Sequence, residues 1–162
     1  MGEKVRLSER WRLAIIGAAT LAILVFVNLQ IAVKERIVRE GTTVLLRLAP
    51  VDPRSLLQGD YMALNYAMER DVAQAAAEAG VADGTIVIAL DAEGVAQFRR
   101  IHEGGATVEG EALLRFRKRG GSVRLASDAW FFEEGTAGEF SGARYGELRV
   151  AQDGEAVLVG VR

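Results

Sequence analysis

Cysteine and histidine, two residue types that often act as nucleophiles, bases or metal ligands, are nearly absent from this 162-residue chain. The sequence contains no cysteine, which excludes disulfide scaffolds, zinc–thiolate sites and cysteine nucleophiles. Its single histidine, His102, argues against a histidine-based metal site or a catalytic triad within one chain. We therefore predict no metal site and no cofactor, and we assign no catalytic residues.

One pair of carboxylates follows the largest aromatic cluster. Glu133 and Glu134 come directly after Trp130-Phe131-Phe132, and together they could form a carboxylate site or bind a cation. Neighbouring residues on a strand point to opposite faces, so a paired site would require a loop. The simpler interpretation is that both carboxylates are solvated, and we keep these five residues as secondary candidates.

The distribution of charged residues limits which classes of binding partner are expected. Residues 1–40 carry seven Lys and Arg against four Glu, whereas residues 41–162 carry thirteen Lys and Arg against eighteen Asp and Glu. The larger part is acidic, which argues against nucleic-acid binding because that requires a net basic face. The basic stretch 115–119 could touch anionic headgroups or phosphate, although a solvated hairpin end explains it as well.

The stretch from Leu13 to Val33 predicts a transmembrane helix. Its 21 residues contain no charge and would extend about 31 Å as a helix, close to the hydrocarbon thickness of a bilayer. The helix could continue to Glu40, where Gly41 is a natural stop. The run is longer than the apolar region of a secretory signal and ends without an A-x-A cleavage site, so we predict an uncleaved signal anchor.

The flanks of this helix define three regions. We predict a cytosolic tail over residues 1–12, the membrane helix over 13–33 and an extracytoplasmic domain over 41–162. Basic residues lie on both sides of the helix, so the orientation depends on the short basic leader before it. Ala14, Ala18 and Ala22 share one face, where a second helix could approach closely, although alanine is also common in such helices.

The residues after Gly41 alternate like short strands separated by glycine turns. Apolar or alternating runs predict strands over 42–49, 61–68, 85–90, 95–102, 107–117, 122–126, 146–150 and 155–161. A helical turn is expected over 53–58 and a short helix over 71–79, with Asp71 as its cap and Gly80 at its end. Residues 136–144 read as a loop or a weak helix. The fold class is therefore mainly β: a small antiparallel β domain, curled or partly closed, with one or two short helices.

Two alternation patterns predict which side chains face the core. In 61–68, one face carries Met62, Leu64 and Tyr66, and the other carries Tyr61, Ala63 and Asn65. In 107–117, Val108, Leu114 and Phe116 are expected to point together into the core.

The first of these strands contains a recognisable motif. Residues 59–66 match G-D-Y-x-x-L-x-Y at every fixed position, and the chain resembles the GDYXXLXY family, small bacterial membrane-anchored proteins. The resemblance extends more loosely to residues 51–58, to 131–135 and to 145–150. It implies an envelope protein and suggests multispanning membrane proteins as partners, but it supplies no catalytic residues.

The motif residues have plausible structural roles. Gly59 permits a turn with positive φ, and Asp60 can bond the amides of the loop before the strand. Leu64 and Tyr66 point together into the core, with the hydroxyl of Tyr66 left for a polar partner. Tyr61 points the other way and could contribute to a binding surface. These five residues are the primary binding candidates.

A second resemblance is partial. Residues 55–60 are similar to the T/S-L-x-x-G-D segment of type I signal peptidases, which are membrane-anchored β proteins. The position of that family's nucleophilic serine is Val51 here, and its proline falls at Arg54. Its general-base lysine has no clear counterpart, because Lys118 is surrounded by arginines. A hydrolase would have to use Ser55, Asp60 and Lys118.

Three functional hypotheses remain. The leading one is a non-enzymatic accessory protein of the bacterial inner membrane, N-terminus in the cytoplasm, whose periplasmic β domain binds a membrane-protein partner. The second is an anchored hydrolase distantly like a signal peptidase. The third is a small-ligand or lipid-binding domain that uses Tyr61 and the aromatic residues 130–132.

Overall fold

The computed structural model describes residues 9–49 and 61–162. The chain divides into two compact units, residues 1–36 and 37–162. The predicted helical turn over 53–58 lies outside the described residues. The second unit begins at Ile37, whose side chain is buried.

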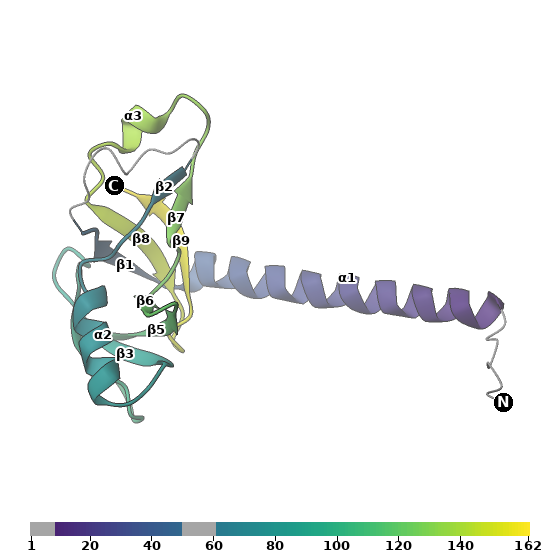
Figure 1. Cartoon of the computed structure of the whole chain (residues 1–162), viewed down its shortest axis with the longest axis horizontal. Coiled ribbons are helices and arrows are strands. Elements are labelled where there is room, and N and C mark those ends of the chain that lie inside the picture. Colours follow the sequence, from purple (N-terminus) through teal and green to yellow (C-terminus); the bar gives the residue numbers. More distant parts are fainter. Residues whose placement is uncertain (1–8, 50–60) are drawn as a thin grey trace. The chain divides into compact units, whose positions relative to one another are not determined.

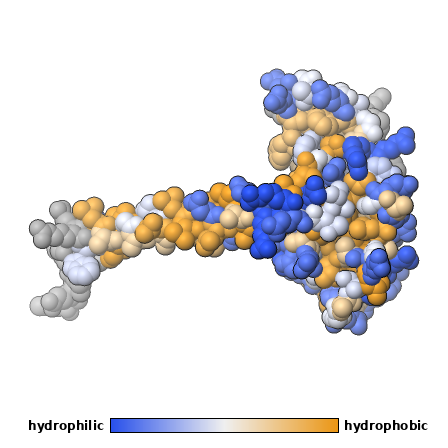
Figure 2. Space-filling view, turned by 180° about the vertical axis from the view of Figure 1, so that it is seen from behind, coloured by the Kyte–Doolittle hydropathy of each residue, from blue (hydrophilic) through white to orange (hydrophobic). Residues whose placement is uncertain are grey.

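The N-terminal helix α1 runs from Glu9 to Glu40 and is long and apolar enough to cross a membrane. Figure 2 shows its surface as mostly orange, with a blue band toward its C-terminal end, where the charged residues of 34–40 lie. The helix ends where the N–H of Gly41 donates to the carbonyl of Ile37 at 2.8 Å. A Cβ at Gly41 would lie 2.5 Å from that oxygen, so the predicted stop requires glycine.

Nine described strands form three short antiparallel sheets. The first contains β1 (Thr42–Arg47), β8 (Tyr145–Val150) and β9 (Ala156–Val161), in that order. The second pairs β2 (Tyr61–Ala63) with β7 (Ala129–Phe131). The third has the order β4 (Ala96–Ile101), β3 (Asp83–Leu90), β5 (Glu111–Arg119) and β6 (Ser122–Arg124). Two short helices, α2 (Glu69–Glu78) and α3 (Ala137–Phe140), complete the unit.

Single bridges connect the sheets into one curled β structure (Figure 1). Leu45 bridges Val95, which joins β1 to the start of β4. The N–H of Arg115 donates to the carbonyl of Gly154 at 2.9 Å, which joins β5 to the turn between β8 and β9. The predicted fold class, a curled antiparallel β domain behind an N-terminal apolar helix, is confirmed.

One hydrophobic core lies inside this curl. Ile86, Val87 and Ile88 of β3 are fully buried, as expected for a central strand covered on both faces. Helix α2 packs against β4 and β6 and buries Val72 and Ala76. Further side chains of the same cluster come from the other strands: Val44, Leu46, Leu114, Phe116, Val123, Leu148 and Val150.

Several details differ from the prediction. Strand β7 was not predicted, and of the strand expected over 61–68 only residues 61–63 form the regular strand β2. Strand β5 begins at Glu111 instead of residue 107, because Gly110 adopts a φ of 82° and turns the chain. Val108 is therefore 66% exposed and does not join Leu114 and Phe116 in the core. Helix α2 begins at Glu69 with Met68 at the N-cap, so Asp71 is not the cap. It lies in the first turn, where its negative charge interacts favourably with the helix dipole.

Candidate functional site

The motif strand has the predicted two-sided character. Met62, Leu64 and Tyr66 are buried, whereas Tyr61 is 39% exposed on the opposite face. Regular strand β2 covers only residues 61–63. The chain stays paired with the segment before β7 through the bond from Leu64 N–H to Asp128 O at 2.8 Å, so side chains continue to alternate between the two faces up to Tyr66. Gly59 and Asp60, the other two motif residues, lie outside the described residues.

Tyr66 makes contacts with several parts of the domain. Its hydroxyl donates to the carbonyl of Ser127 at 2.9 Å, in the connection between β6 and β7. Its backbone forms an isolated bridge with Leu48, just after β1. A Cβ at Gly146 would lie 3.0 Å from the Cε1 atom of Tyr66, so β8 can approach the ring only because it carries glycine there. Burial raises the pKa of Tyr66, and the negative charges of Glu69 and Asp128 raise it further.

The exposed face of the motif strand carries an aromatic pair. Tyr61 is the cross-strand partner of Phe131 on β7, and their ring centroids are 5.8 Å apart at an interplanar angle of 38°. Phe131 is 73% exposed. The next pair on the same face, Ala63 and Ala129, is small, so the two rings project beyond it. We call Tyr61 and Phe131 the outer aromatic pair.

The structure divides the aromatic cluster 130–132 between two faces. Trp130 and Phe132 pack against the core and meet Phe140 of α3, with ring centroids 6.3 Å and 5.2 Å from it. Phe131 points the other way, as strand alternation requires. These aromatic side chains therefore do not form one binding surface, and only Phe131 extends the face that Tyr61 occupies.

The residues considered for a carboxylate site or for hydrolase chemistry either lie on the surface or fall outside the described residues. Glu133 and Glu134 are exposed in the turn after β7. Among the residues that the structure describes, no group of three His, Asp or Glu side chains could hold a metal ion. Of the hydrolase candidates, Ser55 and Asp60 are not described, and Lys118 is an exposed residue of β5.

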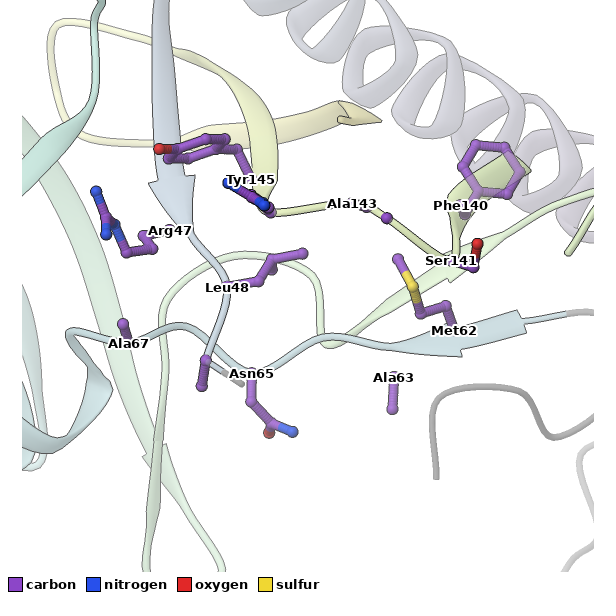
Figure 3. Close-up of a pocket in the computed structure, with 13 residues that line it drawn as sticks. Arg47, Leu48, Met62, Ala63, Asn65, Ala67, Phe140, Ser141, Ala143 and Tyr145 are labelled. Atoms are coloured by element: carbon purple, nitrogen blue, oxygen red, sulfur yellow. The ribbon is translucent and has the colours of Figure 1, made fainter. Parts of the chain in front are cut away.

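A pocket of about 550 Å³ lies at the end of β1. It is lined by three chain segments, residues 47–49, 62–67 and 140–145. Backbone hydrogen bonds tie them together: Leu48 donates to Arg144 O at 2.8 Å and Ala49 donates to Asn65 O at 2.7 Å. Figure 3 shows Leu48, Met62 and Ala143 among the side chains that line the pocket.

Two arginines line this pocket. Arg47 lies at one end, with its guanidinium carbon 5.8 Å from the ring centroid of Tyr145 (Figure 3). Arg144 comes from the loop before β8. Within residues 9–49 and 61–162, neither arginine forms an ion pair with a carboxylate.

Other arginines of the domain do have carboxylate partners. The closest pairs are Arg115–Asp153 at 2.6 Å and Arg100–Glu111 at 2.8 Å, and weaker ones are Arg124–Asp128 at 3.4 Å and Arg162–Glu147 at 3.7 Å. The hydrogen bond from Arg100 lowers the pKa of Glu111. These exposed pairs contribute little stability, and they show that carboxylates neutralise four of the other arginines of the domain.

Sequence reasoning missed the pocket entirely. Its lining residues come from segments almost a hundred residues apart, and only the pairing of β1 with β8 brings them together. The one local signal was the position of Arg47, a charged residue at the end of an apolar strand.

Comparison with known proteins gives one match. A family model described as GDYXXLXY protein matches residues 23–161, which covers most of the chain. No curated protein and no solved structure matches the chain.

The buried hydroxyl of Tyr66 predicts a pH dependence of stability. Because its pKa is higher in the folded state than in the unfolded chain, its contribution is complete below pH 10 and is lost as the pH rises above that value. We expect the free energy of unfolding of the full chain to fall more steeply in the wild type than in Tyr66→Phe between pH 10 and 11.5. The difference in slope should approach about 1.4 kcal/mol per pH unit.

Denaturant unfolding followed by circular dichroism at several pH values measures both slopes. At neutral pH the variant should be less stable by about 0.5–1.5 kcal/mol, the usual net contribution of one hydrogen bond. Parallel pH profiles for the two proteins would contradict a buried, protonated hydroxyl.

Proposed function

The chain belongs to the GDYXXLXY protein family, and we propose that it is a membrane-anchored, non-enzymatic binding protein of the bacterial inner membrane. In this proposal α1 crosses the membrane, and the β domain contacts a membrane-protein partner through the outer aromatic pair. The observation that carries the proposal is the exposure of Tyr61 and Phe131 on one face of the paired strands β2 and β7, whose other face packs against the core.

The properties of α1 support membrane anchoring. Large apolar side chains such as Leu13, Leu21 and Phe26 are exposed around it, a pattern that favours a lipid surrounding. The side-chain amide of Asn28 donates to Leu24 O at 2.8 Å, so one of its two N–H donors is satisfied within the helix. The face of Ala14, Ala18 and Ala22 would let a second helix approach closely.

The outer aromatic pair has the composition of a protein contact. Tyrosine and phenylalanine are enriched at the centres of interfaces, where they bury a large area at low entropic cost. The two rings support each other across the β2–β7 ladder, so they are positioned before a partner arrives. The motif thus combines an inward half, Leu64 and Tyr66, that builds the core with an outward residue, Tyr61, that recognises the partner.

We expect a photoreactive phenylalanine analogue at position 131 of the full chain to form a covalent adduct with a membrane protein in native membranes. In this background, Tyr61→Ala should reduce the adduct at least about tenfold, because losing an aromatic anchor at an interface typically costs 2 kcal/mol or more. Immunoblotting and mass spectrometry of the adduct measure both effects.

The matched control is the same analogue at position 108. Val108 is an apolar side chain of similar exposure, 66% against 73% for Phe131, and it lies outside the outer aromatic pair. Equal adducts from positions 108 and 131, or an adduct at 131 that persists in Tyr61→Ala, would rule out recognition through this pair.

The orientation is tested with single cysteines, since the chain has none of its own. We expect Val108→Cys to react with a membrane-impermeant maleimide in intact spheroplasts and Ser8→Cys to react only after lysis. Both proteins should remain in the membrane pellet after carbonate extraction. The reverse labelling pattern, or recovery of the chain in the supernatant, would refute the proposed topology.

A further inference from the structure

We propose that the pocket at the end of β1 binds a small amphiphilic anion, a phosphate monoester or carboxylate attached to a short apolar group. Its lining residues do not include Tyr61 or Phe131. The proposal is therefore independent of partner recognition by the outer aromatic pair.

The size and construction of the pocket suit a small molecule. Its volume of about 550 Å³ lies within the range of typical ligand sites. Its walls are joined by backbone hydrogen bonds, from Leu48 to Arg144, from Ala49 to Asn65 and from Ala67 to Arg47, at 2.7–2.9 Å. Because these bonds hold the walls in place without a ligand, binding would require little ordering of the protein.

The interior surface is mainly apolar. Leu48, Met62, Ala143 and Phe140 contribute carbon atoms to the lining (Figure 3). A short alkyl or aromatic group of a ligand could therefore bury its apolar surface against these side chains. These side chains account for an apolar group on the ligand, and they say nothing about its charge.

The charged groups specify the sign of the ligand. Arg47 and Arg144 line the pocket, and no described lining residue is acidic. The domain as a whole carries more carboxylates than cations, and several of its other arginines are paired with them. Within residues 9–49 and 61–162 these two arginines have no carboxylate partner, so an anion is the ligand that complements this pocket.

The polar chemistry of these residues fits a phosphate or carboxylate. A guanidinium group presents parallel N–H donors that match the oxygens of either anion, and it stays charged throughout the physiological pH range. Asn65 and Ser141 also line the pocket. The Ser141 hydroxyl donates to Gly138 O at 2.8 Å, which leaves its oxygen as an acceptor for a protonated ligand oxygen or water.

The test uses the full chain in nanodiscs of zwitterionic phosphatidylcholine, with hexyl phosphate as the probe and isothermal titration calorimetry as the measurement. We expect saturable binding of one hexyl phosphate per chain. Inorganic phosphate, which lacks the apolar group, and hexanol, which lacks the charge, should each bind at least about tenfold more weakly.

The double variant Arg47→Gln/Arg144→Gln should weaken hexyl phosphate binding by about a hundredfold, since two charge-assisted contacts are lost. Arg117→Gln/Arg119→Gln is the control, because it removes the same charge from exposed residues of β5 that do not line the pocket. The control should bind within about twofold of the wild type, because neither side chain lines the pocket and salt screens exposed surface charges.

If the double variant does not fold, judged by circular dichroism, Arg144→Gln alone serves instead, because that side chain is exposed. Unchanged affinity in the pocket variants, an equal loss in the control, or no saturable binding by the wild type would overturn the proposal. Repeating the titration in discs that contain phosphatidylglycerol then identifies the source of the anion. Displacement of hexyl phosphate indicates a lipid headgroup, and undiminished binding indicates a soluble organic anion.

Discussion

The close contact between Tyr66 and Gly146 is the interaction on which the β domain depends. The domain consists of three sheets of two to four strands, and several of these strands are only three residues long. Sheets of this size cannot each bury a core in water. They share one core instead, and the ring of Tyr66 lies where the end of β1, strand β8 and the connection between β6 and β7 approach one another.

This arrangement also determines which motif residue is available to a partner. Side chains alternate along an extended chain, so burying Leu64 and Tyr66 places Tyr61 on the outer face. The same rule places Phe131 beside Tyr61, because its neighbours Trp130 and Phe132 pack inward against Phe140. The exposed aromatic pair is therefore a direct consequence of how the core is built.

The pocket has a related origin. Leu48 and Ala49 continue the chain beyond Arg47, the last paired residue of β1. Ala49 bonds to the motif segment and Leu48 bonds to the residues before β8. Most side chains at this junction are small or apolar, and its only described charged side chains are the two arginines. A junction between sheets thus creates a concave surface, whereas the middle of each sheet is filled by core side chains.

Local patterns were sufficient to predict much of this fold. The apolar run and Gly41 predicted α1 and its end, and the Gly120-Gly121 pair predicted the β5–β6 turn, where both residues have positive φ. Strict alternation predicted the inward and outward faces of the motif. The start of β5 was misplaced because Val108 fits a strand pattern although Gly110 turns the chain before the strand begins.

The candidate sites were harder to predict because they depend on pairing between distant segments. The motif drew attention to Tyr61, but nothing local indicates that Phe131 is its cross-strand partner, seventy residues later. The same holds for Arg47 and Arg144, which become neighbours of one pocket only through the β1–β8 ladder. Composition and periodicity report on local structure, and they contain no information on which strands meet.

Native-state hydrogen exchange of Gly146→Ala tests most directly whether Tyr66 and Gly146 join the sheets. A methyl group at this position would require the Tyr66 ring to shift by a few tenths of an ångström, whereas Gly138→Ala, the control, adds a methyl group in open space. If the account is correct, the amides of Leu46, Leu64 and Ile88 lose protection by a similar factor in Gly146→Ala and remain unchanged in Gly138→Ala. Loss of protection confined to residues near Gly146, with the amide of Ile88 as protected as in the wild type, would contradict it.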